Sequence, residues 1–427
     1  MAIEILTPLI AALRARCLST ISINKDPVNY GVELEFVFAF HEGELDLGQT
    51  NGIPNTLSKN LSYFQREQYP EFSKFKPSEF PNLIYNSWGV QKGNSTKLDA
   101  YDAEPQAIVK RKIESRFSEI PTKISGTLYA TKKCQKDMEY YIKWLVPVDH
   151  SVCGLGLDNL PKWLPKRVAN PSEWDSYGLE LVSPILYTGL PSKRDEISKI
   201  LNAAVGTDNY KHGPFITNQC GLHVHVEAPK DIKVLKELAV LLLLCEEELS
   251  RLHPRSRRPG HASAKRQIDS NRLYFQLGND PNFGKESDDY LKADCSTNAL
   301  QKNVTVQQIH QRIRLIKKKT ALSQKMCWPA PQHNPNGNQY CLINFVYLTQ
   351  GEGYAEAIEF RQARGTTSAE EVNHWVDFCV GLVKLAEFYL KIPARFLVKS
   401  WNDLRAENNV LYQLMQDIEL SDEAIGF

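Results

Sequence analysis

The chain has 427 residues, and its 51 Lys and Arg nearly balance its 50 Asp and Glu. A near-neutral chain has no global electrostatic attraction to nucleic acid or to an acidic membrane surface, which excludes those partners as a general expectation. The longest apolar run covers 238–245, whereas a membrane crossing needs about 20 residues. The nine cysteines are scattered and never form a C-x-x-C pair, which disfavours a disulfide framework and a zinc ribbon. We therefore expect a soluble, cytoplasmic protein.

The predicted elements alternate between helices and strands that lie far apart in the sequence. Such an order favours the α+β class, with a mainly antiparallel sheet backed by helices in a single domain, 1–427. The strand core is predicted over about 30–40 and 140–395, an insertion or lid over 41–140, and a helical tail over 396–427. The elements expected in chain order are a helix over 2–18, strand 30–40, helix 102–117, strand 178–186, helix 191–204, strand 216–227, a buried helix 232–253, a basic helix 305–319, strands 340–348 and 357–362, and helix 368–391.

Four of the expected strands carry polar side chains two residues apart, with large apolar residues between them. Residues i and i+2 of a strand share a face, so one face would be polar and the other would pack a core. Glutamate is depleted in strands, and neighbouring like charges cost stability unless a cation or an arginine neutralises them. The pattern therefore predicts a functional surface. Its residues are Glu33 and Glu35, Glu180, His223, His225 and Glu227, and Glu359 and Arg361.

Carboxylates with an imidazole suit a hard or borderline divalent cation such as Mg²⁺ or Mn²⁺. Each motif alone has a simpler interpretation. The G-x-E-x-E segment fits a solvated strand edge, the His-x-His segment fits a hydrogen-bonded core pair, and the Glu-x-Arg segment fits a surface ion pair. Arg257 and Arg258 fit either a phosphate-binding loop or a solvated turn. Cys220, close to His223, is a candidate nucleophile without an identified partner.

Taken in order, these motifs resemble the putative amidoligase family, a branch of the glutamine-synthetase-like carboxylate–amine ligase superfamily, in a fungal-type member. The residues that carry the resemblance are Gly31-x-Glu33-x-Glu35; Trp144 with Asp149 and Ser151; Leu179-Glu-Leu-Val-Ser-Pro184; Cys220-Gly-Leu-His-Val-His225; Tyr340 with Asn344; and Ile358-Glu-Phe-Arg-Gln362 with Gly365-Thr366 and Trp375.

The resemblance implies a sheet curved into a half-barrel or funnel, with ATP at one end, divalent metal in the middle and the acceptor carboxylate at the other end. It implies catalytic roles for Arg361, Glu359 and His225. ATP phosphates would contact His225, Arg257, Arg258 and Arg361. The implied metal ligands are Glu33, Glu35, Glu180, His223 and Glu359.

The expected function is an ATP- and Mg²⁺-dependent (or Mn²⁺-dependent) ligase that joins a small-molecule or peptide carboxylate to an amine through an acyl phosphate. Two alternatives remain open at this point. One is a metal-dependent hydrolase built on the His223/His225 motif, with a metal-bound water. The other is a non-catalytic protein that keeps the ligase fold and binds a partner.

Overall fold

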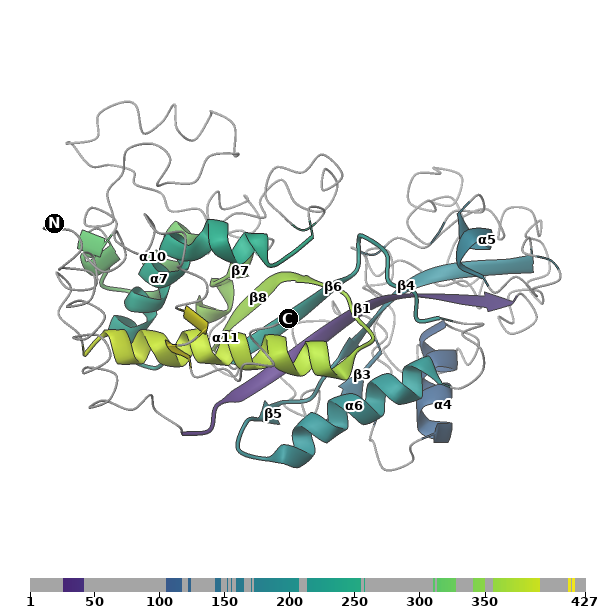
Figure 1. The fold of residues 1–427 in the computed structure, drawn as a ribbon. Coiled ribbons are helices and arrows are strands. Elements are labelled where there is room, and N and C mark those ends of the chain that lie inside the picture. The colour runs from purple at the N-terminus through teal and green to yellow at the C-terminus, as the bar shows by residue number, and fades with distance from the viewer. Residues whose placement is uncertain are drawn as a thin grey trace, which may run out of the picture. The chain divides into compact units, whose positions relative to one another are not determined.

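The computed structural model describes a large part of the chain, and Figure 1 shows the elements named below. The described residues are 26–41, 105–116, 122–123, 143–146, 152, 155, 159–164, 170, 173–206, 213–254, 257, 310–311, 313–327, 341–349, 356–391, 414–415 and 417–418. The helix expected over 2–18, most of the insertion over 41–140 and most of the tail over 396–427 lie outside them.

The chain divides into two compact units. The N-terminal unit comprises Gly31–Leu222 and Arg364–Val372, and the C-terminal unit comprises Met1–Tyr30, His223–Ala363 and Asn373–Phe427. The single domain expected from the sequence stays a prediction.

The N-terminal unit is built on the strand order β2-β3-β4-β1, with β5 paired to β1. The β1–β4 and β3–β4 pairs are antiparallel, whereas β2 and β3 run parallel. The long β1 is rich in aromatic and β-branched residues, which favour strands, and its phenylalanines Phe36, Phe38 and Phe40 are buried. The strands are β1 (Asn29–His41), β2 (Thr122–Lys123), β3 (Trp144–Leu145), β4 (Trp174–Val182) and β5 (Leu186–Tyr187).

Helices α4 (Pro105–Arg116) and α6 (Pro191–Val205) pack against each other in this unit, as Figure 1 shows. Arg116 Nη1 donates to the carbonyl oxygen of Ala203 at 2.6 Å. A proline opens α6, where no backbone N–H is needed, and Gly206 ends it with φ of 65°. The unit also contains the short helix α5 (Leu160–Trp163).

The C-terminal unit has the strand order β6-β8-β7. β7 and β8 are antiparallel, with Ile343 opposite Phe360 and Asn344 opposite Glu359. β6 begins in the N-terminal unit and continues here from His223. The elements are β6 (Gly221–Glu227), α7 (Ile232–Arg251), α10 (Lys319–Met326), β7 (Ile343–Asn344), the 3-10 helix η10 (Val346–Thr349), β8 (Ala357–Arg364) and α11 (Ala369–Tyr389).

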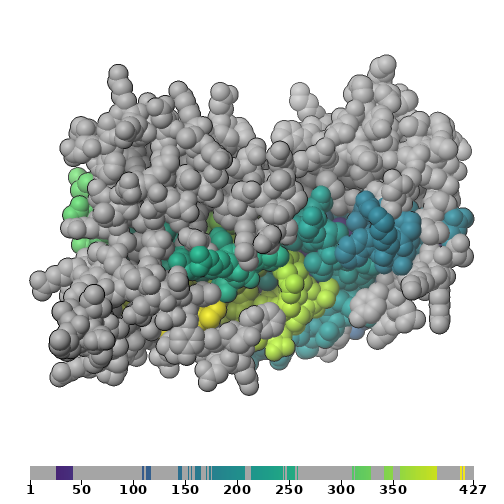
Figure 2. Space-filling view, turned by 45° about the horizontal axis from the view of Figure 1, so that its top comes forward, coloured from purple at the N-terminus to yellow at the C-terminus, as the bar shows by residue number. Residues whose placement is uncertain are grey.

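The buried helix expected over 232–253 is confirmed as α7. Asp231 caps it by accepting the Lys233 backbone N–H at 2.8 Å. Its leucines are buried on most sides, which matches the nearly encircling apolar pattern of the sequence. Residues of α7 and of α11 reach the surface on the face drawn in Figure 2, in green-teal and yellow-green.

Several expected elements differ from the structure. The strand expected over 216–227 begins only at Gly221, and the strand expected over 178–186 is Trp174–Val182. Two further elements differ more. The basic helix over 305–319 is interrupted: residues 310–311 and 313–314 are helical, a turn follows, and α10 starts at Lys319, whose Nζ pairs with Glu356. The strand expected over 340–348 is only Ile343–Asn344, because the Asn344 side chain accepts the Val346 backbone N–H at 2.8 Å and turns the chain into η10.

The α+β class with a mainly antiparallel sheet is therefore confirmed. In the part of the chain that the structure describes, the helices are too short or too polar to cross a membrane.

Candidate active site

The site in the C-terminal unit is centred on Glu359, which β8 holds in the interior. Alternation along β8 places Glu359 and Arg361 on one face and the fully buried Ile358 and Phe360 on the other. The exposed fraction of Glu359 is 0%. A carboxylate removed from water in this way needs partners that satisfy its charge.

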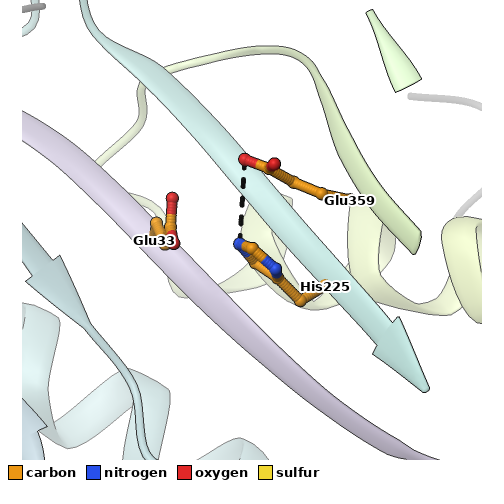
Figure 3. Close-up of side chains that lie close together, drawn as sticks. All are labelled: Glu33, His225 and Glu359. Atoms are coloured by element: carbon orange, nitrogen blue, oxygen red, sulfur yellow. Dashed lines mark ion pairs between the residues drawn. The ribbon is translucent and has the colours of Figure 1, made fainter. Parts of the chain in front are cut away.

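Four side chains approach the Glu359 carboxylate. Arg361 Nη1 donates to Oε1, and His223 Nδ1 and His225 Nε2 lie 3.5 Å and 3.7 Å from the same oxygen. Figure 3 shows the His225–Glu359 pair. On the other oxygen, Asn344 Nδ2 donates to Oε2 at 2.8 Å. Burial of Glu359 excludes the interpretation of the Glu359–Arg361 pair as a solvated surface ion pair.

The two histidines come from β6, where His223 is buried and His225 is partly exposed. The ring of His225 lies against Tyr347 of η10, with centroids 5.3 Å apart. Alternation along β6 again sends Leu222 and Val224 to the opposite face, where they are buried. Both imidazoles therefore approach the same buried carboxylate oxygen, and their role as a core pair or as ligands stays a prediction.

Arg257 lies directly beside β8. It is buried, and its Nη2 donates to the backbone oxygen of Arg361 at 2.8 Å. This contact ties the segment after α7 to the strand that carries the site. Arg258, the other arginine expected to contact phosphate, lies outside the described residues.

The N-terminal unit brings three of the predicted carboxylates together. The β1–β4 register places Glu35 directly opposite Glu180, and their exposed fractions are only 3% and 4%. Carboxylate oxygens of Glu33 and Glu180 lie within 4.8 Å of each other. Glu35 Oε2 accepts the backbone N–H of Gly221. Like charges directly opposite on a sheet destabilise it, so this arrangement favours a bound cation.

The donor set fits a hard or borderline divalent cation. Carboxylate oxygens are the preferred ligands of Mg²⁺, and an imidazole nitrogen is compatible with Mn²⁺. Of the predicted residues, the N-terminal unit holds Glu33, Glu35 and Glu180, and the C-terminal unit holds His223, His225, Arg257, Glu359 and Arg361. Joint action of the two sets stays a prediction.

The hydrogen bond from Asn344 to Glu359 could not be predicted from the sequence. Asn344 belongs to the motif set, but its role depends on the register between β7 and β8, which places it opposite Glu359. Tyr347 is a second such residue, since it reaches His225 only because η10 follows β7 immediately. No sequence pattern encodes either contact.

The candidate nucleophile Cys220 belongs instead to the apolar core of the N-terminal unit. Its Sγ accepts the Thr217 backbone N–H at 3.4 Å. The five cysteines in the described part of the chain are buried and lie outside disulfides, and burial raises the pKa of the Cys379 thiol. These observations favour structural roles for them. They are Cys220, Cys245, Cys327, Cys341 and Cys379.

Residues 26–383 match the family model described as "Putative amidoligase enzyme". The match covers most of the chain and both units, so the chain belongs to this family of ligase-type enzymes, as the motifs predict. Comparison with curated proteins and with solved structures gave no match. The fungal type stays a prediction.

Proposed function

We propose that this protein is an ATP-dependent carboxylate–amine ligase that forms an amide bond through an acyl phosphate and uses Mg²⁺ or Mn²⁺. Family membership supports the ligase class. The observation that carries the proposal is the buried Glu359 carboxylate, which has an arginine and two histidines around one oxygen. A guanidinium and two imidazoles in this arrangement would stabilise the negative charge that develops on a transferring phosphoryl group.

The chemistry follows from the poor reactivity of a carboxylate toward an amine. One carboxylate oxygen of the acid attacks the γ-phosphorus of ATP, the bond to the bridging oxygen breaks, and ADP leaves with that oxygen. The amine nitrogen then attacks the carbonyl carbon, phosphate leaves with the acid's former oxygen, and a base takes the amine proton. No protein side chain needs to form a covalent bond.

The residues proposed to hold the cation are Glu33, Glu35, Glu180, His223 and Glu359. A bound Mg²⁺ or Mn²⁺ would neutralise charge on the nucleotide phosphates. The carboxylate oxygens of Glu33 and Glu180, which lie within 4.8 Å of each other, support this assignment, because a cation between them would relieve their repulsion.

Arg361, His225 and Arg257 are proposed to act on the phosphates. Arg361 is only partly exposed and keeps its guanidinium on the polar face of β8, where its planar fork matches phosphate oxygens. His225, also partly exposed, would donate to a phosphate oxygen from β6. Arg257 supports Arg361 by donating to its backbone oxygen. Arg258 is proposed to contact the phosphates beside these residues.

The test is a screen for ADP and phosphate release from ATP and Mg²⁺ against pooled small-molecule and peptide carboxylates and amines. Release that requires one acid and one amine supports the proposal. Hydroxylamine in place of the amine should trap the activated acid as a hydroxamate. ADP release that depends on neither substrate would contradict it.

The same screen separates the two alternatives. A hydrolase built on His223 and His225 would cleave amide or ester pools with Zn²⁺ and ignore ATP. A non-catalytic protein would bind neither MgATP nor Mn²⁺. Either result, obtained with folded protein, would replace the ligase proposal.

A further inference from the structure

Asn344 is a buried asparagine whose two side-chain polar atoms are both engaged. Its exposed fraction is 1%. Oδ1 accepts the backbone N–H of Val346 at 2.8 Å, and Nδ2 donates to Glu359 Oε2 at 2.8 Å. The first contact turns the chain from β7 into η10, and the second crosses to the facing residue of β8.

The hydrogen bond from Val346 fixes which atom of the Asn344 side chain faces Glu359. A backbone N–H only donates, so the amide oxygen of Asn344 must face Val346 and its NH₂ group must face Glu359. Oε2 of Glu359 is thereby engaged on the Asn344 side. Oε1 is the oxygen that faces Arg361, His223 and His225.

We propose that Asn344 is a positioning residue that presents Glu359 to the cation through one oxygen, Oε1. This inference rests on the proposed function. Beyond that function, the inference states that Glu359 would bind the cation as a monodentate ligand whose rotation is fixed by the amide of Asn344. Hydrogen bonds to a ligating carboxylate orient it in this way in metal sites.

The β7 segment has a separate anchor, which makes a matched control possible. The backbone N–H of Phe345 donates to Cys327 Sγ at 3.1 Å, and Cys327 Sγ lies 3.8 Å from the Ile343 oxygen. Cys327 therefore holds the same segment through Phe345 and Ile343 rather than through Glu359. A Cys327→Ala change should loosen the segment while the groups that form the Asn344–Glu359 bond are kept.

The experiment compares Asn344→Ser, Asn344→Leu and Cys327→Ala in the full chain, with each variant's folding checked by circular dichroism. Serine keeps an acceptor for the Val346 N–H but is too short to reach Glu359, whereas leucine keeps the volume and removes both contacts. Each protein is titrated with Mn²⁺ alone by calorimetry. Both Asn344 variants should lose about 10- to 100-fold in Mn²⁺ affinity, and Cys327→Ala should match the parent.

A double variant separates positioning from general loosening. If Asn344 acts through Glu359, adding Asn344→Ser to Glu359→Gln should cost little further Mn²⁺ affinity, because the two effects are coupled. Additive losses, or equal losses in Cys327→Ala and Asn344→Ser, overturn the inference. A parent protein that binds no Mn²⁺ and turns over no ATP would instead remove the proposed function itself.

Discussion

At the scale of single residues, the burial of Glu359 decides against one interpretation of the Glu359–Arg361 pair, that of a solvated surface ion pair. Their order in the sequence is compatible with a surface ion pair, which contributes about 0–1 kcal/mol. The structure buries Glu359 completely and surrounds one of its oxygens with three cationic or imidazole groups. The burial of Glu359 could not be predicted from the alternating residues of its strand. Alternation shows that the strand has two faces, but it does not show which other elements cover each face.

Arg361→Lys should leave the protein folded and lower ATP turnover by roughly 10²-fold or more, the scale of losing one electrostatic contact to a transition state. Lysine keeps the charge but loses the two-pronged grip on phosphate oxygens. Turnover is measured as ADP release on the substrate pair from the screen. Full turnover in the folded variant would remove Arg361 from the site.

Glu359→Gln should lower turnover to a similar extent and also cost about 1–3 kcal/mol of unfolding free energy, because it removes hydrogen bonds to a charged group. Denaturant unfolding measures the second effect. The contact between Asn344 and the remaining amide oxygen limits the loss. An unchanged stability would mean that Glu359 is not held by the partners described above.

At the scale of elements, the sequence predicts β1, β4, α6, α7, β8 and α11 well, because each has a long and regular apolar pattern. It does not predict the short β7 and η10, because one side-chain hydrogen bond from Asn344 ends the strand. Strand register likewise determines that Glu35 lies opposite Glu180. Strand register depends on tertiary packing and turns, which the pattern of one strand does not contain.

Glu180→Gln should act on stability in opposite directions with and without a divalent cation. In chelator it removes one of the two like charges of Glu33 and Glu180, whose oxygens lie within 4.8 Å of each other, and should raise the unfolding free energy by up to about 1 kcal/mol. With Mg²⁺ or Mn²⁺ it should remove stabilisation that the parent protein shows. Thermal unfolding in both conditions measures the two effects.

Glu196→Gln is the matched control for this prediction. Glu196 lies on α6 in the same unit, where it accepts from Trp144 Nε1 at 2.9 Å and pairs with Lys193. Its replacement should lower stability equally with and without the cation. A Glu180→Gln variant that behaves like this control would argue against a cation between Glu33 and Glu180.

Gly178→Ala tests the packing of β4. A Cβ at Gly178 would lie 1.9 Å from the backbone oxygen of Val152, which is not the mobile end of a side chain. Overpacking of this kind costs about 1–3 kcal/mol, and we expect a loss in that range by denaturant unfolding. A variant as stable as the parent would show that the segment at Val152 moves away freely.

At the scale of the whole molecule, the sequence correctly predicts the α+β class and the family. Motif order carries that result, since each motif alone is common. What the sequence does not settle is the relation between the carboxylates of the N-terminal unit and the histidines of the C-terminal unit. That relation depends on tertiary structure between segments as far apart as Glu33 and His225, which are 192 residues apart in the sequence.

Nucleotide binding should require a divalent cation, because the proposed carboxylate ligands would hold the nucleotide phosphates only through a bridging cation. ATP with Mg²⁺ or Mn²⁺ should raise the melting temperature more than either component alone, since ligands that bind only the native state stabilise it by mass action. Differential scanning calorimetry measures the shifts. Tight stoichiometric Zn²⁺ binding without a response to MgATP would favour the hydrolase.

The most direct test of the ligase proposal follows an oxygen atom. The acid that supports ADP release is prepared with isotopically labelled carboxylate oxygens and incubated with ATP, Mg²⁺ and the amine, and the phosphate product is examined by mass spectrometry. An acyl phosphate intermediate transfers one labelled oxygen to each phosphate released. Phosphate that carries no label, formed together with the amide, would contradict activation of the acid by ATP.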